Sequence, residues 1–222
     1  MTGLVCLQGG AEFGRTCADV DRLLLTRSPG PVVLMPLASK PGFEFRTTAA
    51  EGAAWYRKLG AERVDVIPDV RIEPAGLDAA RTMLATAALV VLPGGSPARL
   101  LDGLTEIGLD SALSEVLDRG GAVSGASAGA MVLCEQTILP ETSPPRIAPG
   151  LGIVSGVFVI PHYRGGAPSW IAAFEQPPAL PALGIPECTG VLAEGGDLRW
   201  IGPAPAVLIG PDGTTEPLPR VA

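Results

Sequence analysis

Histidine and lysine are scarce in this chain of 222 residues, which contains one histidine, His162, and two lysines, Lys40 and Lys58. The four cysteines are scattered, and none has the Cys-x-x-Cys spacing of a zinc or redox site. We therefore expect no metal site, and nothing in the sequence calls for a cofactor. Scattered thiols are typical of reduced cysteines, so the cytoplasm is the expected compartment.

Basic runs, aromatic residues and long apolar runs are also lacking. The formal net charge is −7 and aromatic residues form 5% of the chain, which argues against a nucleic-acid partner because binding phosphates requires a concentrated basic face. The longest nearly continuous apolar run, residues 83–92, is too short to span a bilayer. No basic leader precedes an apolar segment, so no signal peptide and no membrane partner are expected.

Apolar residues are abundant, at 47% of the chain, and they fall into short runs separated by helix-like stretches. This alternation predicts an α/β fold with a doubly wound, mostly parallel sheet and helices on both faces, in a single domain spanning residues 1–222. The predicted strands are residues 4–7, 32–35, 64–67, 88–92 and 122–124, and the predicted helices are residues 18–25, 47–59, 77–87 and 107–117.

The last third of the chain has a different pattern of short apolar runs with tight turns between them. Residues 157–160 form a predicted strand and residues 170–174 a short helix. The runs at 189–192, 198–201 and 206–209 are separated by Gly-Gly-Asp and Gly-Pro turns. This spacing predicts a C-terminal antiparallel extension of the same sheet.

The most informative segment is Gly-Ala-Ser-Ala-Gly at residues 125–129, which follows a predicted strand and precedes a helical pattern. This is the context of a nucleophile elbow, in which small residues two positions before and after the serine permit a sharp turn. The alternative is an ordinary strand–helix turn in a chain rich in glycine and alanine. Motif and context together favour Ser127 as a nucleophile.

A serine nucleophile requires a general base, and the only histidine follows the predicted strand at 157–160. A lone histidine is more often a surface or core residue, but its pairing with Ser127 favours His162 as the base. The base needs a carboxylate to orient it, and spacing alone leaves four downstream candidates open. These candidates are Glu175, Glu187, Glu194 and Asp197.

Backbone N–H groups near the nucleophile would form the oxyanion hole. Ala128 follows Ser127 directly, and the Gly94-Gly95 turn after the fourth predicted strand is the candidate for the second donor. An ordinary turn at Gly94-Gly95 is an equal alternative.

A competing motif occupies residues 9–16, which match a phosphate-binding P-loop except that Arg15 replaces the lysine. Glu12 would repel a phosphate there, so nucleotide binding is the weaker hypothesis.

With these motifs the chain resembles the serine peptidase family that contains dipeptidase E (aspartyl dipeptidase) and cyanophycinase. The resemblance rests on Gly-Ala-Ser-Ala-Gly-Ala at 125–130, Pro-His-Tyr at 161–163 and Gly-Ile-Pro-Glu at 184–187. It implies a fold like that of class I glutamine amidotransferases, with Ser127 as nucleophile, His162 as base and Glu187 as the orienting acid. It also links the Gly94-Gly95 turn to the oxyanion hole.

The sequence thus predicts a serine hydrolase that cleaves a short peptide or isopeptide through an acyl-enzyme. Family relatives that bind aspartyl groups carry several polar or basic residues after the histidine, whereas Arg164 is the only cation in residues 163–170. Tyr163 and Arg164 are the candidate substrate-binding residues. The expected partner is a small peptide substrate, and a homodimer is the assembly considered. The alternative function is a non-catalytic small-molecule binding or regulatory protein on the same fold.

Overall fold

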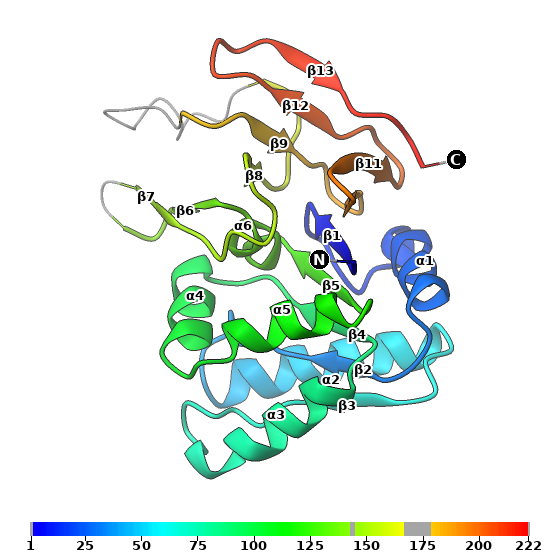
Figure 1. The fold of residues 1–222 in the computed structure, drawn as a ribbon, viewed down its shortest axis with the longest axis vertical. Helices are drawn as coiled ribbons and strands as arrows, with labels where there is room; N and C mark the ends of the chain where they lie inside the picture. The colour runs from blue at the N-terminus through cyan, green and yellow to red at the C-terminus, as the bar shows by residue number, and fades with distance from the viewer. Residues whose placement is uncertain (1, 143–144, 167–178, 222) are drawn as a thin grey trace.

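A seven-stranded mixed sheet forms the centre of the protein (Figure 1), as described by a computed structural model for residues 2–142, 145–166 and 179–221. The strand order is β11-β10-β1-β5-β4-β2-β3, and the five strands from β1 to β3 run parallel. β10 pairs antiparallel with β1, and β11 with β10. The strand bounds are β1 Leu4–Gln8, β2 Val32–Leu34, β3 Val64–Val66, β4 Leu89–Leu92, β5 Ala122–Ala126, β10 Gly190–Glu194 and β11 Asp197–Ile201.

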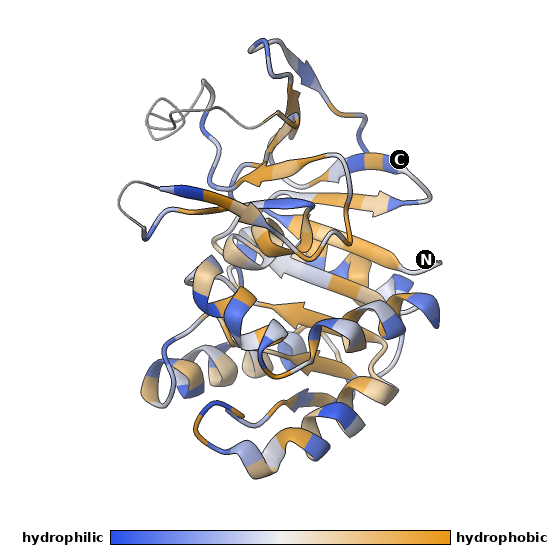
Figure 2. Ribbon diagram, turned by 60° about the vertical axis from the view of Figure 1, so that its left-hand side comes forward, coloured by the Kyte–Doolittle hydropathy of each residue, from blue (hydrophilic) through white to orange (hydrophobic). Residues whose placement is uncertain are grey.

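Helices cover both faces of this sheet because its strands are apolar on both sides. In β4, Leu89 packs in one buried cluster with residues of α1 and α2, whereas Val90 packs in the other with residues of α3, α4 and α5. Figure 2 shows the hydrophobic colour concentrated in the strands. The predicted α/β class is confirmed. The helix bounds are α1 Ala18–Arg27, α2 Phe43–Lys58, α3 Leu77–Thr86, α4 Pro97–Thr105, α5 Asp110–Asp118 and α6 Ala128–Leu133, with 3-10 turns η1 Arg15–Cys17 and η2 Pro74–Gly76.

One helix, α4, was not expected from the sequence. Its start carries an N-cap signal, because the Ser96 hydroxyl accepts a hydrogen bond from the Arg99 N–H at 3.1 Å and Pro97 occupies the first helical position. The helix expected from residue 107 begins only at Asp110.

The C-terminal extension is only partly as predicted. β10 and β11 extend the main sheet, but residues 157–160 and 206–209 contribute to a second, four-stranded sheet with the order β13-β12-β9-β8. A β6–β7 hairpin forms a third, small sheet. The predicted helix at 170–174 lies outside the described residues. The remaining strand bounds are β6 Gln136–Leu139, β7 Arg146–Pro149, β8 Phe158–Ile160, β9 Ala182–Gly184, β12 Val207–Ile209 and β13 Thr215–Pro217.

The register of the main sheet places the ends of four strands at one rim. Gln8 at the end of β1 is paired with Ala126 of β5 and with Gly190 at the start of β10, and Leu92 of β4 is paired with Gly125. Loops that follow parallel strands at such a rim are where ligands bind in open α/β sheets. Within the described part of the chain, none of the helices is long and apolar enough to cross a membrane.

Candidate active site

Ser127 lies in a sharp turn between β5 and α6, with φ 49° and ψ −108°. A non-glycine residue rarely adopts a positive φ, and such strain is typical of a nucleophile elbow. A Cβ on Gly125 would lie 2.4 Å from the carbonyl carbon of Gly129, and a Cβ on Gly129 would lie 2.2 Å from the Leu92 oxygen. Both positions therefore require glycine. The Ser127 N–H donates to the Gln8 oxygen at 2.9 Å, which ties the elbow to the end of β1.

His162 follows β8 and also has a positive φ, of 52°. Its backbone N–H donates to the Gly9 oxygen at 2.8 Å. Its ring rests on Gly10, where a Cβ would lie 2.3 Å from Cε1. This contact directs the ring toward the elbow, and Nε2 lies 3.0 Å from Ser127 Oγ.

Glu187 reaches the other side of the imidazole, with Oε1 at 3.0 Å from His162 Nδ1. The turn that carries it is fixed by the first Gly-Gly pair. Cys188 N–H donates to the Gly10 oxygen at 3.0 Å, and a Cβ on Gly9 would lie 2.0 Å from the Pro186 oxygen. The side chains of His162 and Glu187 are each 46% exposed, so solvent reaches this hydrogen-bonded pair.

Glu194 and Asp197, two other carboxylates considered from the sequence, do not lie at this rim. Because β10 runs antiparallel to β1, Glu194 lies at the opposite end of the strand from Gly190, and its carboxylate pairs with Arg27 at 2.7 Å. Asp197 is paired with Glu194 across the hairpin. Glu175 is the candidate that lies outside the described residues.

The two candidate substrate-binding residues differ in their surroundings. Tyr163 packs against the hydrophobic core, and its ring covers Gly184, where a Cβ would lie 2.9 Å away. Arg164 is 84% exposed, and its Nη2 lies 3.9 Å from Glu187 Oε1. Their roles in substrate binding stay predictions.

The Gly94-Gly95 turn lies beside the nucleophile. A Cβ on Gly94 would lie 3.4 Å from Ser127 Cβ, and Ala128 is the first residue of α6. The Gly94 N–H already has an acceptor, Glu12 Oε1, at 2.7 Å. From the sequence, Glu12 was only an obstacle to phosphate binding. Its position beside the Gly94 turn depends on the conformation of its loop, which sequence patterns do not predict.

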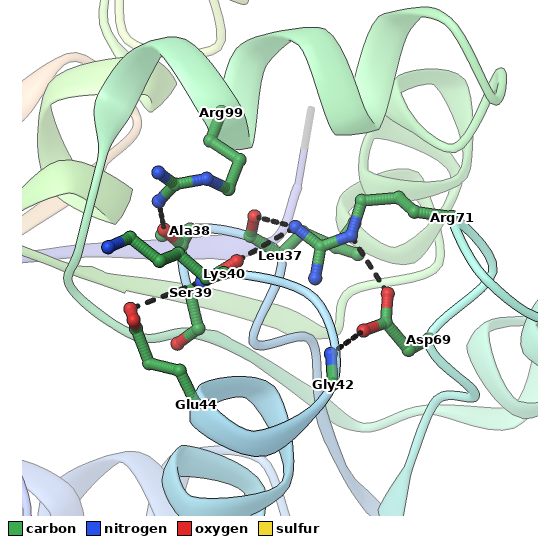
Figure 3. A network of polar contacts seen from close by, with 9 residues as sticks. All are labelled: Leu37, Ala38, Ser39, Lys40, Gly42, Glu44, Asp69, Arg71 and Arg99. Atoms are coloured by element: carbon green, nitrogen blue, oxygen red, sulfur yellow. Dashed lines mark hydrogen bonds and ion pairs between the residues drawn. The ribbon is translucent and has the colours of Figure 1, made fainter.

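Residues 37–39, in the loop that follows β2, pack against the Gly94-Gly95 turn. Gly95 has φ 140°, and a Cβ there would lie 2.6 Å from the Ala38 oxygen. Figure 3 shows how two arginines hold that loop. Arg99 donates to the Ala38 oxygen at 2.7 Å, and Arg71 donates to the Leu37 oxygen at 2.7 Å and the Ser39 oxygen at 2.9 Å. Neither arginine was predicted to support the site.

A buried polar cluster lies behind the elbow. The Gln8 amide donates to Asp21 Oδ1 at 3.0 Å and to Ser124 Oγ at 2.9 Å, and Trp55 and Tyr56 also donate to Asp21. Desolvation raises the pKa of the Asp21 carboxyl, while the hydrogen bonds from Trp55, Gln8 and Tyr56 oppose that shift. This cluster anchors Gln8, whose carbonyl holds the Ser127 N–H.

The first two glycines of residues 9–16 are explained by packing rather than by a phosphate. Gly9 faces Pro186 and Gly10 faces the His162 ring, so both glycines permit the close approach of the Ser127, His162 and Glu187 segments. Among the described residues, no group of three or more histidine, cysteine or acidic side chains could hold a metal ion. All four cysteines are free and buried.

Known proteins similar to this chain include a cyanophycinase and two proteins described as peptidases. Cyanophycinase of Trichormus variabilis is 28% identical over 233 aligned residues, which cover 96% of this chain and 75% of that relative. The crystal structure of a peptidase from an acI-B1 Actinobacterium matches all of this chain and 96% of its own, with a TM-score of 0.84 and 25% identity. A candidate peptidase E protein of Listeria monocytogenes EGD-e shares the fold, with a TM-score of 0.63 and 16% identity over 92% of this chain and all of its own.

The family profile of peptidase family S51 matches residues 7–201, a span that contains the elbow, the histidine and the glutamate described above. The predicted resemblance to the family of peptidase E and cyanophycinase is thereby confirmed, and the chain is a peptidase hydrolase. The chain belongs to peptidase family S51.

Proposed function

We propose that this peptidase cleaves short peptides through a Ser127–His162–Glu187 triad and an acyl-enzyme. The observation that carries the proposal is the continuous chain of contacts from Ser127 Oγ to His162 Nε2, at 3.0 Å, and from His162 Nδ1 to Glu187 Oε1, also at 3.0 Å. Nucleophile, base and orienting carboxylate thus follow one another within hydrogen-bond reach.

In this mechanism neutral His162 accepts the Ser127 proton at Nε2 while Oγ attacks the scissile carbonyl. Glu187 accepts the Nδ1–H hydrogen bond, which fixes the tautomer and stabilises the imidazolium. His162 then donates its proton to the leaving amine, and an ester on Ser127 remains. Water that loses its proton to His162 hydrolyses the ester and restores the free serine.

The developing oxyanion needs N–H donors on the side of Ser127 opposite the base. Ala128 at the start of α6 is the first proposed donor, and the Gly94-Gly95 turn supplies the second. The exposed guanidinium of Arg164, close to Glu187, is the proposed contact for a polar or anionic group of the substrate. Tyr163 packs the turn that carries His162 against Gly184, and it directly precedes Arg164 in this turn.

A dipeptide-library hydrolysis screen tests the proposal. The wild type is expected to release amino acids from a subset of dipeptides, and Ser127→Ala to lose about 10⁴-fold or more of that rate with an unchanged melting temperature. Ser111→Ala, an exposed position in α5, is the matched control and should retain full activity. A folded Ser127→Ala protein that still cleaves dipeptides would refute the assignment. A wild type that binds dipeptides but cleaves none of them would favour the alternative of a non-catalytic binding protein.

A further inference from the structure

The Glu12 carboxylate lies at the Gly94 turn, beside Ser127. A Cβ on Gly94 would lie 2.9 Å from Glu12 Oε1 and 3.4 Å from Ser127 Cβ, so carboxylate and nucleophile flank the same glycine. Oε1 accepts the Gly94 N–H at 2.7 Å, and hydrogen bonds of this kind to a carboxylate are stronger than those to a neutral oxygen. One of the amides proposed for the oxyanion hole is therefore bonded to a carboxylate.

The loop that carries Glu12 is anchored on both sides of it. Its neighbours Ala11 and Phe13 both have positive φ, of 59° and 63°, a conformation that must be held by surrounding contacts. The Ala11 oxygen accepts from Cys17 Sγ at 2.9 Å. The Phe13 ring packs edge-on against Tyr56, with centroids 6.4 Å apart. Glu12 therefore stays beside the nucleophile and can change partner only by moving its own side chain.

This arrangement conflicts with catalysis unless a cation intervenes. An oxyanion forming next to a carboxylate would be destabilised, and the Gly94 N–H cannot serve both groups fully. Among the described residues, Glu12 makes no ion pair. The missing positive charge would have to come from the substrate.

We propose that Glu12 is a specificity-determining residue that binds a cationic nitrogen of the substrate close to the scissile carbonyl. The carboxylate then exchanges its bond with Gly94 for the cation, and the freed N–H binds the carbonyl oxygen. Two groups of the substrate could supply this cationic nitrogen. One is the α-ammonium group of the residue that carries the scissile carbonyl, when that residue is N-terminal, and the other is a cationic side chain on the same residue. The inference rests on the proposed function and adds a charge requirement to it.

Three substrates that share alanine as the leaving group separate these sources: Leu-Ala, N-acetyl-Leu-Ala and N-acetyl-Lys-Ala. The wild type is expected to show a kcat/KM at least about tenfold higher for Leu-Ala or N-acetyl-Lys-Ala than for N-acetyl-Leu-Ala, since a hydrogen bond to a charged group is worth a factor of about ten or more. The favoured substrate identifies the source of the charge.

Glu12→Gln keeps the size of the side chain and an oxygen for the Gly94 N–H but removes the charge. We expect it to reduce the preference for the cationic substrate about tenfold or more, with a rise in KM for that substrate. Glu51→Gln, at an exposed position of α2, is the control and should keep the wild-type preference. A purely structural Glu12 would instead slow all three substrates by the same factor.

Labelling by a fluorophosphonate separates failure of this inference from failure of the proposed function. A wild type that is labelled at Ser127 but shows no preference for a cationic substrate, or a Glu12→Gln variant that keeps the preference, overturns the role of Glu12 and leaves the triad in place. A wild type that is neither labelled nor active overturns both.

Discussion

Replacement of Glu187 by glutamine isolates the contribution of the orienting carboxylate. The change keeps the side-chain shape but removes the charge 3.0 Å from His162 Nδ1. Opposite charges about 4 Å apart attract by about 4 kcal/mol at an effective dielectric constant of 20 and by about 1 kcal/mol in water. Because both side chains are 46% exposed, we expect an intermediate loss of about 2–3 kcal/mol in transition-state stabilisation. The corresponding decrease in kcat is about 10²-fold, smaller than the roughly 10⁴-fold loss in a triad with a buried acid.

The assay is steady-state hydrolysis of the best dipeptide from the screen, at a pH where His162 is neutral in both proteins. Glu194→Gln is the matched control, because Glu194 pairs with Arg27 at the other end of β10 and should change the rate less than about threefold. If Glu187→Gln retains the wild-type rate, or if Glu194→Gln is the crippled variant, the orienting role derived from the structure is wrong.

Two further substitutions test the supporting structure. Gly10→Ala should lower kcat by about 10²-fold or more, because the added Cβ would lie 2.3 Å from the His162 ring. The control is Gly60→Ala, whose position has a similarly positive φ but no atom within 4 Å, so it should keep the wild-type activity. Equal losses in the two variants would refute the packing argument. Asp21→Asn tests the raised pKa of the buried carboxyl. Above the ordinary aspartate pKa of about 4, the unfolded chain releases this proton while the folded chain retains it, so the wild-type contribution to stability is present at low pH and is lost as pH rises through the raised value. In urea unfolding, the stability of the wild type relative to Asp21→Asn should therefore fall from pH 4 toward pH 7, and a difference that stays constant or grows would contradict the shift.

The elbow and the class of the fold could be predicted because their signals are local. Gly125 is required by its contact with Gly129 within one strand–helix turn, and continuous apolar strands directly indicate a sheet buried on both faces. Such features depend on neighbours in the sequence, which a pattern records.

The parts that could not be predicted depend on long-range pairing. Spacing alone left Glu187 and Glu194 open, and only the family resemblance pointed to Glu187. The two glutamates are separated in space by the antiparallel register of β10 on β1, which joins residues more than 180 positions apart. The second sheet similarly depends on β9 pairing with both β8 and β12. Glu12 reaches the Gly94 turn beside Ser127 because two left-handed residues bend its loop, and no propensity predicts a positive φ at Phe13.

The most direct test of the central claim is the site of covalent modification by a fluorophosphonate, read by intact-mass and peptide mass spectrometry. We expect a single adduct on Ser127 in the wild type, none in Ser127→Ala, and a strongly slowed reaction in His162→Ala. An adduct on another serine, or wild-type protein that stays unmodified while folded, would contradict the assignment of Ser127 as the nucleophile.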